Sequence, residues 1–235
     1  MTTAPSLLGD AELEAAIRAG VGPSFWAARD PERAAVIDPV RGAAGDRTFA
    51  ALDARANRLA RGLHAAGLRA GDGIALLSRN RAEFCEVWAA TNRAGLRLTP
   101  VNWHLTAEES AYVVDDCEAK AIVADASVAA VASGAAAGAP RAALRLAVGG
   151  AIDGFAAYDD FLAQHAPHAL AEPSLGTSML YTSGTTGRPR DPRRAGSCRT
   201  STGAATSTSA RARSTTLRRS ASRWGSRSPR ACRWC

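Results

Sequence analysis

The stretch Met179–Arg190 has the sequence Met-Leu-Tyr-Thr-Ser-Gly-Thr-Thr-Gly-Arg-Pro-Arg. A short apolar run leads directly into a turn that is rich in hydroxyl groups and glycines. Glycine lets the backbone adopt positive φ and approach a ligand closely, and successive free N–H groups in such a turn surround an anion. Hydroxyl donors and the charges of Arg188 and Arg190 add to this effect. The stretch therefore predicts a phosphate-holding loop at the end of a strand.

A plain surface turn is the alternative for a loop of this composition, and two known motifs do not apply. The Walker A motif needs Gly-x4-Gly-Lys-Ser/Thr, whereas Gly184 and Gly187 are three residues apart and no lysine follows. The nucleophile elbow Gly-x-Ser-x-Gly needs a glycine two residues before its serine, where Tyr181 precedes Ser183.

Upstream of the loop, short apolar segments alternate with segments of helical periodicity. Strands are predicted at 74–77, 96–101, 121–124, 144–148 and 178–181. Helices are predicted at 11–19, between Thr48 and Gly67, at 81–94, at 106–116, in the alanine-rich stretch after residue 124, and at 158–165. Residues 134–140 are predicted to form a flexible connector. This alternation predicts an α/β fold with a largely parallel sheet flanked by helices, which binds ligands beyond the carboxyl ends of its strands.

Local signals support several of these boundaries. Thr48 is a suitable helix N-cap, and Thr106 with Glu109 fits a capping box. Residues 74–77 are all apolar, as expected of a strand that is buried on both faces. The helix at 81–94 is predicted to place four side chains on one side: Phe84, Val87, Trp88 and Thr91.

The stretch at 181–190 resembles the phosphate-binding signature of the adenylate-forming, or AMP-binding, enzymes. This superfamily contains acyl-CoA synthetases, the adenylation domains of peptide synthetases and luciferases. Residues 181–189 match its pattern throughout, whereas Arg190 replaces the usual lysine. Further segments are similar to family landmarks in the same order: 47–52, 57–60, 67–72 and 102–109. The resemblance covers residues 24–190, and the form Asn102-Trp103-His104-Leu105-Thr106 is most similar to acyl-CoA synthetases for fatty or aromatic acids.

The resemblance implies a fold, a reaction and a set of binding residues. The fold would be the N-terminal part of the family's large domain, so residues 24–190 would form a partial AMP-binding domain. ATP would adenylate a carboxylic acid with Mg²⁺, and CoA would then displace AMP. The ATP phosphates would be held by Thr182, Ser183, Gly184, Thr185, Thr186, Gly187 and Arg190. The family's Tyr-Gly-x-Thr-Glu segment and its catalytic lysine do not occur in the 235 residues, so the catalytic residues stay unassigned and a truncated, inactive fragment is expected.

Residues 191–235 differ in composition from the rest of the chain. They contain eleven arginines and one acidic residue, whereas residues 1–190 contain 18 basic and 21 acidic residues. They have no Ile, Val, Met, Phe or Tyr, so they are predicted to be disordered. The favoured interpretation is a tail translated out of frame from a gene rich in G and C. The alternative is a basic arm that binds RNA or membranes by counterion release.

The other candidate sites are weak. The odd number of cysteines, five, and the absence of a secretory leader predict a cytoplasmic chain. No transmembrane segment is predicted, because no apolar run approaches the ~20 residues of a membrane span. No metal site is predicted, because His165 and His168 lack a third ligand and Cys232-x-x-Cys235 lacks a second pair. His64 is predicted to lie on the solvated side of its helix, and His104 in a structural turn. No specific nucleic-acid partner is expected, and the oligomeric state stays open. A non-catalytic nucleotide- or phosphate-binding remnant, or a basic-tailed nucleic-acid binder, remains the alternative function.

Overall fold

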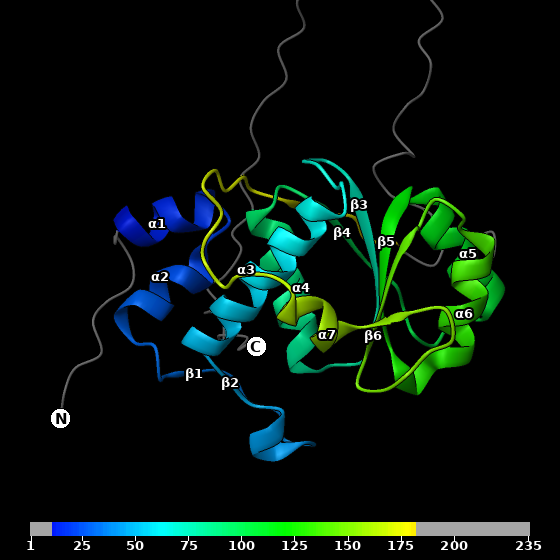
Figure 1. The fold of residues 1–235 in the computed structure, drawn as a ribbon, viewed down its shortest axis with the longest axis horizontal. Coiled ribbons are helices and arrows are strands. Elements are labelled where there is room, and N and C mark those ends of the chain that lie inside the picture. Colours follow the sequence, from blue (N-terminus) through cyan, green and yellow to red (C-terminus); the bar gives the residue numbers. More distant parts are fainter. Residues whose placement is uncertain (1–10, 182–235) are drawn as a thin grey trace, which may run out of the picture. The chain divides into compact units, whose positions relative to one another are not determined.

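The computed structural model describes residues 11–181, and residues 1–10 and 182–235 lie outside the described part. Figure 1 shows the order of the elements. The helices are α1 Ala11–Arg18, α2 Gly22–Arg29, α3 Phe49–Ala65, α4 Ala82–Arg93, α5 Ala107–Asp116, α6 Ala129–Gly138 and α7 Tyr158–Ala163, with short 3-10 turns at Gly42–Ala44 and Ala126–Val128. The strands are β1 Ala34–Val36, β2 Arg47–Thr48, β3 Gly73–Leu77, β4 Arg97–Pro100, β5 Ala119–Asp125, β6 Leu144–Val148, β7 Ala156–Ala157 and β8 Thr177–Ser178.

The central feature is a six-stranded sheet with the order β7-β6-β5-β3-β4-β8. All its neighbouring strands are parallel, as the alternation of strands and helices predicts. The strands β1 and β2 form a separate antiparallel ribbon. Because β8 pairs with β4 in parallel, the chain leaves β8 in the direction in which the other strands end.

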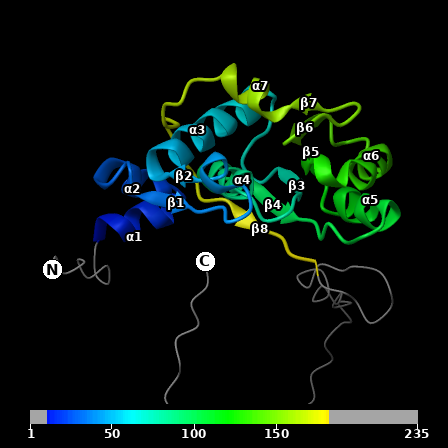
Figure 2. The same cartoon turned by 90° about the horizontal axis from the view of Figure 1, so that it is seen from below.

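Helices cover both faces of this sheet, which confirms the predicted α/β class (Figure 2). The helices α3, α4 and α7 pack in one core cluster with Ile74 and Leu76 of β3. The helices α5 and α6 pack in the other cluster with Ala75 and Leu77 of the same strand. Successive residues of a strand point to opposite faces, so the all-apolar sequence of β3 follows from its burial on both sides.

The predicted helix ends are confirmed where their signals are local. The side chain of Thr48 accepts a hydrogen bond from the N–H of Ala51 at 3.2 Å. Thr106 and Glu109 form the complete capping box. Gly67 and Gly95 follow α3 and α4 with φ of 91° and 69°, values that favour glycine at a helix C-terminus.

The predicted connector at 134–140 is wrong, because α6 continues through Gly138. A Cβ atom added at Gly134 would lie 2.5 Å from the Cβ of Ala107, and one added at Gly138 would lie 2.6 Å from that of Ala111. The two glycines therefore let α6 pack closely on α5. Their role is close packing between the two helices. Helix propensity alone cannot distinguish glycines with this role from glycines in a loop.

Several other elements differ from the prediction. The helix α2 and the ribbon β1–β2 were not predicted, the helix from Tyr158 ends at Ala163, and the paired part of the last strand is Thr177–Ser178. On α4, Val87 and Thr91 are buried as expected, but Trp88 is 46% exposed. The same helix instead buries Glu83 and Glu86, which pair with arginines, and Arg93, which pairs with Asp53.

Candidate functional site

The loop residues predicted to bind phosphate, Thr182, Ser183, Gly184, Thr185, Thr186, Gly187 and Arg190, lie outside the described residues. The segment that leads into them is described, and it is held firmly against β4 and the end of α4. Its backbone N–H groups donate to carbonyl oxygens from Ser174 to Arg93 (3.1 Å), Gly176 to Asn92 (2.8 Å), Thr177 to Leu96 (3.0 Å) and Met179 to Leu98 (2.8 Å). The strand that precedes the loop is thus fixed in register as far as Met179.

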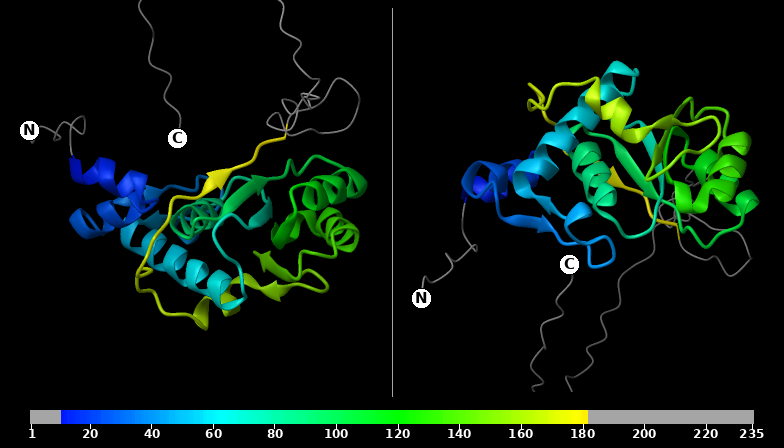
Figure 3. Two further views of the ribbon diagram at one scale, coloured as in Figure 1. Left: turned by 90° about the horizontal axis from the view of Figure 1, so that it is seen from above. Right: turned by 60° about the horizontal axis from the view of Figure 1, so that its bottom comes forward.

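Gly176 explains how this segment approaches so closely. A Cβ atom at this position would lie 2.5 Å from the carbonyl oxygens of both Leu96 and Thr91. Distances below about 3.0 Å to backbone atoms leave no room for a side chain, so only glycine fits here. Figure 3 shows β8 lying beside the rest of the sheet and the chain continuing past it.

Beyond Met179 the chain is held by a side chain. The hydroxyl of Tyr181 donates to Oδ2 of Asp116, the last residue of α5, at 2.5 Å. The ring of Tyr181 also packs against the core cluster that contains α5 and α6. The last described residue before the loop is therefore attached to a helix on one face of the sheet.

A polar cluster follows the carboxyl ends of β3 and β4, the region in which parallel α/β sheets bind ligands. The guanidinium of Arg79 lies 4.6 Å from the ring centroid of Trp103. The Trp103 ring in turn lies 3.4 Å from that of His104, between centroids. The backbone N–H of His104 donates to Oδ1 of Asn102 at 3.1 Å. The sequence identified Trp103 and His104 through the family resemblance and missed Arg79, whose only local signal is its place after a buried strand.

An ion-pair network lies beside this cluster and joins three elements. Arg81 contacts Glu83 at 2.8 Å and Asp125, at the end of β5, at 3.0 Å. Arg41 contacts the same Glu83 at 3.2 Å. Burial by itself would raise the pKa of Glu83, but the hydrogen bonds from Arg81, from the backbone and from Arg41, together with the charge of Arg81, outweigh burial and hold the pKa at about 2. The pKa of Asp125 is also lowered, because bonds from the Ser127 N–H and from Arg81 outweigh its burial.

A second network surrounds Glu86 in the middle of α4. This carboxylate is fully buried and accepts from Arg47 at 2.8 Å, Arg55 at 2.7 Å and the Tyr158 hydroxyl at 3.1 Å. It therefore ties α4 to β2, α3 and α7. Burial raises the pKa of Tyr158 well above its ordinary value, and the negative charge of Glu86 adds to this rise. Both networks therefore tie α4 to neighbouring elements of the fold.

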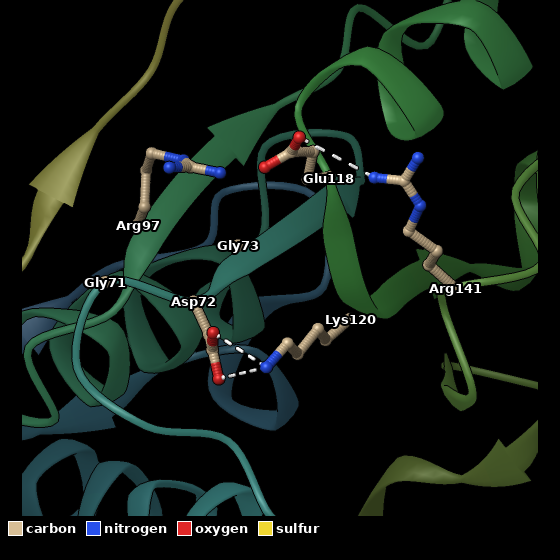
Figure 4. Close-up of a pocket in the computed structure, with 7 residues that line it drawn as sticks. All are labelled: Gly71, Asp72, Gly73, Arg97, Glu118, Lys120 and Arg141. Carbon is tan, nitrogen blue, oxygen red and sulfur yellow. Dashed lines mark hydrogen bonds and ion pairs between the residues drawn. The ribbon is translucent and has the colours of Figure 1, made fainter.

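A shallow hollow of about 450 Å³ lies at the opposite, amino-terminal ends of β3, β4 and β5. Figure 4 shows its charged side chains, most of which are paired with one another. Lys120 contacts Asp72 at 2.9 Å, and Arg141 contacts Glu118 at 3.6 Å. This hollow is separate from the ends of the strands where the predicted ligand would bind.

The remaining candidates do not assemble into a site. His104 is exposed, and His165 packs edge-on against Phe161 with centroids 5.1 Å apart. Burial raises the pKa of both Cys85 and Cys117, which are free thiols. Between residues 11 and 181, no group of three or more His, Cys, Asp or Glu side chains could hold a metal ion. Over the same residues, no helix has the length and apolar character to cross a bilayer. Cys232 and Cys235 lie outside this part of the chain.

A parallel sheet with helices on both faces and a glycine-rich motif after one strand is typical of nucleotide-binding α/β proteins. The chain belongs to the AMP-binding enzyme family, whose family model matches residues 24–190. This match confirms the resemblance on which the sequence interpretation rests.

Two of the relatives that the chain is similar to are named as fatty-acid ligases. The chain is 31% identical over 172 residues to a fatty acid–[acyl-carrier-protein] ligase, ScoC, of Streptomyces coeruleorubidus, covering 71% of this chain and 31% of the relative. It is 32% identical over 155 residues to the long-chain-fatty-acid–CoA ligase FadD13 of Mycobacterium tuberculosis, covering 61% and 28%. The chain thus spans less than a third of the length of these relatives.

The fold is similar to that of solved ligase structures. The N-terminal domain of FACL13 from Mycobacterium tuberculosis, in a crystal structure with a bound inhibitor, superposes with a TM-score of 0.64 at 27% identity. The superposition covers 74% of this chain and 43% of that chain. The chain therefore has the fold of part of the N-terminal domain of adenylate-forming enzymes, as the resemblance implies.

Proposed function

We propose that the chain derives from an ATP-dependent carboxylic acid–CoA ligase that works through an acyl-adenylate. The observation that carries the proposal is the backbone-anchored segment from Ser174 to Met179, which leads the family's phosphate-binding sequence out of the sheet beside β4. The names of the relatives favour a fatty acid as the carboxylic acid. The name of ScoC indicates that it joins its fatty acid to an acyl carrier protein. We assign CoA as the acceptor for this chain, because residues 102–106 are most similar to those of acyl-CoA synthetases.

In the proposed reaction, a carboxylate oxygen attacks the α-phosphorus of ATP and the bond to pyrophosphate breaks. The CoA thiolate then attacks the acyl carbon, and AMP leaves. The backbone N–H groups and hydroxyls of residues 182–187 would hold the β- and γ-phosphates, and Arg190 would stabilise the departing pyrophosphate. Donors arranged in advance around developing charge supply much of the rate in such reactions.

Mg²⁺ accompanies ATP in this chemistry and would neutralise part of the phosphate charge. Residues 11–181 offer no cluster of metal-binding side chains. The protein ligands of the ion therefore stay unassigned, and no step of the proposal depends on them.

The proposal includes the division of the chain at residue 190. Residues 24–190 belong to the AMP-binding domain, and residues 191–235 belong to a different reading frame. The 235-residue product would bind phosphate groups in the cytoplasm and would not catalyse, because binding without the groups that act in the transition state gives no rate. The composition change at Asp191, immediately after the signature, supports this proposal.

The test compares two purified proteins in a pyrophosphate-release assay with ATP and a fatty acid. The 235-residue chain should release no pyrophosphate. A chain in which the codons after residue 190 are translated in the displaced frame should release it. ATP- and acid-dependent release by the 235-residue chain would refute its inactivity. If neither displaced frame of the gene encodes Tyr-Gly-x-Thr-Glu, the reading-frame proposal is wrong.

A basic-tailed nucleic-acid binder is the second candidate, and the eleven arginines of residues 191–235 favour it. Filter binding of RNA to the chain, with and without residues 191–235, separates the two. Affinity that is carried by the tail and abolished by salt would reflect only non-specific charge. Sequence-specific RNA binding that persists in salt would favour the second candidate.

A further inference from the structure

The hollow at the amino-terminal ends of β3, β4 and β5 contains an arginine whose hydrogen-bonding groups are only partly used. Nη2 of Arg97 donates to the carbonyl oxygen of Cys117 at 2.7 Å. Nε of the same guanidinium is buried and has no hydrogen-bond partner among the described residues. The two ion pairs that line the hollow are made by Lys120 and Arg141 instead. A buried N–H group without an acceptor is unfavourable, so an acceptor supplied by a ligand would be stabilised at this point.

The two ion pairs of the hollow differ in how readily a ligand could replace them. Lys120 contacts Asp72 at 2.9 Å, and the same carboxylate accepts from the Arg69 N–H at 2.8 Å. Arg141 and Glu118 are 3.6 Å apart, and their side chains are 60% and 57% exposed. An ion pair as open as this one contributes little to stability. A more highly charged anion can therefore take the place of Glu118 on Arg141, while Lys120 stays paired with Asp72.

The backbone of Glu118 gives independent evidence that its side chain has a role in the hollow. Glu118 follows Cys117, the C-cap of α5, and has φ of 55°. Glycine adopts this left-handed conformation with least strain and is the usual residue at such a helix end. Figure 4 shows the Glu118 carboxylate between the guanidinium groups of Arg97 and Arg141. An acid held at a position that favours glycine points to a function for its carboxylate.

We propose that this hollow binds a phosphate dianion, free or as a small phosphate monoester, and that Glu118 occupies Arg141 when the anion is absent. A phosphate group has three strong acceptor oxygens and a charge of roughly −1.5 to −2 at neutral pH. It can therefore accept from Arg141 through two oxygens, the geometry that a guanidinium favours, and from Nε of Arg97 through the third. A carboxylate has a single charge and no advantage over Glu118. The hollow, of about 450 Å³, has room for either form of phosphate.

This site is distinct from the loop that the proposed function assigns to ATP, because it lies at the opposite ends of the strands. The inference therefore does not depend on the proposed function. Its test must read out binding at the hollow itself, since the arginines of residues 191–235 also attract anions.

The test is an NMR titration of the full 235-residue chain that follows the amides of Gly73 and Glu118. Inorganic phosphate, glycerol 3-phosphate and acetate are added separately at constant ionic strength. Three variants change the hollow: Arg97→Met, Arg141→Gln and Glu118→Gln. Arg18→Gln removes a positive charge from α1, where the Arg18 side chain is 69% exposed, and serves as the matched control.

Phosphate and glycerol 3-phosphate should shift the two amides saturably, and acetate should not. Arg97→Met should weaken phosphate binding about tenfold, in line with the loss of a charge-assisted hydrogen bond. Arg141→Gln should weaken it about threefold, because this guanidinium is more exposed. Glu118→Gln should tighten binding about threefold, because the competing carboxylate is removed. Arg18→Gln should bind as the wild type does.

The absence of a saturable shift at Gly73 and Glu118 would overturn the proposal, and so would an equal response to acetate. Equal affinity of the wild type, Arg141→Gln and Glu118→Gln would also overturn it. These two variants change exposed side chains, so they decide the matter even if Arg97→Met fails to fold. Saturable binding of only one of the two phosphate compounds would support the site and identify which form it takes.

Discussion

At the scale of single residues, Glu86 is the buried carboxylate that joins α4 to its neighbouring elements. It is fully buried and holds two arginines and a tyrosine from three other elements. Removing one partner of a buried ion pair leaves the remaining charge uncompensated and costs about 3–5 kcal/mol. We expect Glu86→Ala to lower the free energy of unfolding by this amount in urea denaturation. Glu172→Ala, at an exposed loop position, should change it by less than about 0.5 kcal/mol, and equal effects would contradict the role of Glu86.

Glu83 gives the protein an acid-sensitive component of stability. Its pKa is about 2 in the folded chain against an ordinary value of 4.5, because the hydrogen bonds and charge of Arg81, with bonds from the backbone and Arg41, together outweigh its burial. A carboxylate with a lowered folded pKa stabilises the fold above its unfolded pKa, and this stability is lost as pH falls toward the folded pKa. The free energy of unfolding should therefore decline as pH falls from about 5 to about 2. Glu83→Gln should flatten this decline and Glu172→Gln should not, and an unchanged pH dependence in Glu83→Gln would refute the assignment.

Residue-level prediction from the sequence was accurate for local signals and failed for distant ones. The cap at Thr48 and the capping box at Thr106 use partners three residues away, so the sequence contains both halves of each interaction. The partners of Glu86, and Asp125 as a partner of Arg81, lie tens of residues away and come together only in the folded chain. Periodicity therefore assigned Trp88 to the apolar side of α4 and overlooked the buried acids on the same helix.

At the scale of elements, the contact between α5 and α6 depends on glycines that the sequence analysis assigned to a loop. In Gly134→Ala the new Cβ atom would lie 2.5 Å from that of Ala107. Overpacking of this kind costs about 1–3 kcal/mol, which exceeds the gain of up to about 1 kcal/mol in helix propensity. We expect Gly134→Ala to lower the free energy of unfolding, and Ala107→Gly in the same chain to restore part of it. Ser133→Ala on the exposed side of α6 is the control, and additivity of the two substitutions would contradict the proposed contact.

The sequence predicted the longer elements well and the short ones poorly. Strand β3 is buried on both faces, and β5 contains the buried apolar run 121–124, so their composition alone identifies them. The two-residue strands β7 and β8 exist only because a neighbouring strand pairs with them. Gly176 illustrates the same limit, because its need for glycine arises from two carbonyl oxygens on other segments.

At the scale of the whole molecule, strand–helix alternation predicted a parallel sheet but not its strand order. The order places β8 at one edge beside β4, and the segment that enters the phosphate signature is held there by backbone bonds, Gly176 and the Tyr181–Asp116 contact. The family match over residues 24–190 supports the functional interpretation. The site residues themselves follow from the sequence signature, and they remain predictions that binding experiments can test.

The central claim is that residues 182–190 bind the phosphates of ATP in this chain. Calorimetric titration of the 235-residue protein with MgATP tests it most directly, with Gly184→Val as the loop variant and Gly203→Val as the matched control. A β-branched side chain at Gly184 should block the close approach of backbone N–H groups to phosphate. We predict that the wild type and Gly203→Val bind MgATP alike and that Gly184→Val binds at least about tenfold more weakly, a difference of about 1.4 kcal/mol. Equal affinity of all three proteins, or no binding by a folded wild type, would contradict the account.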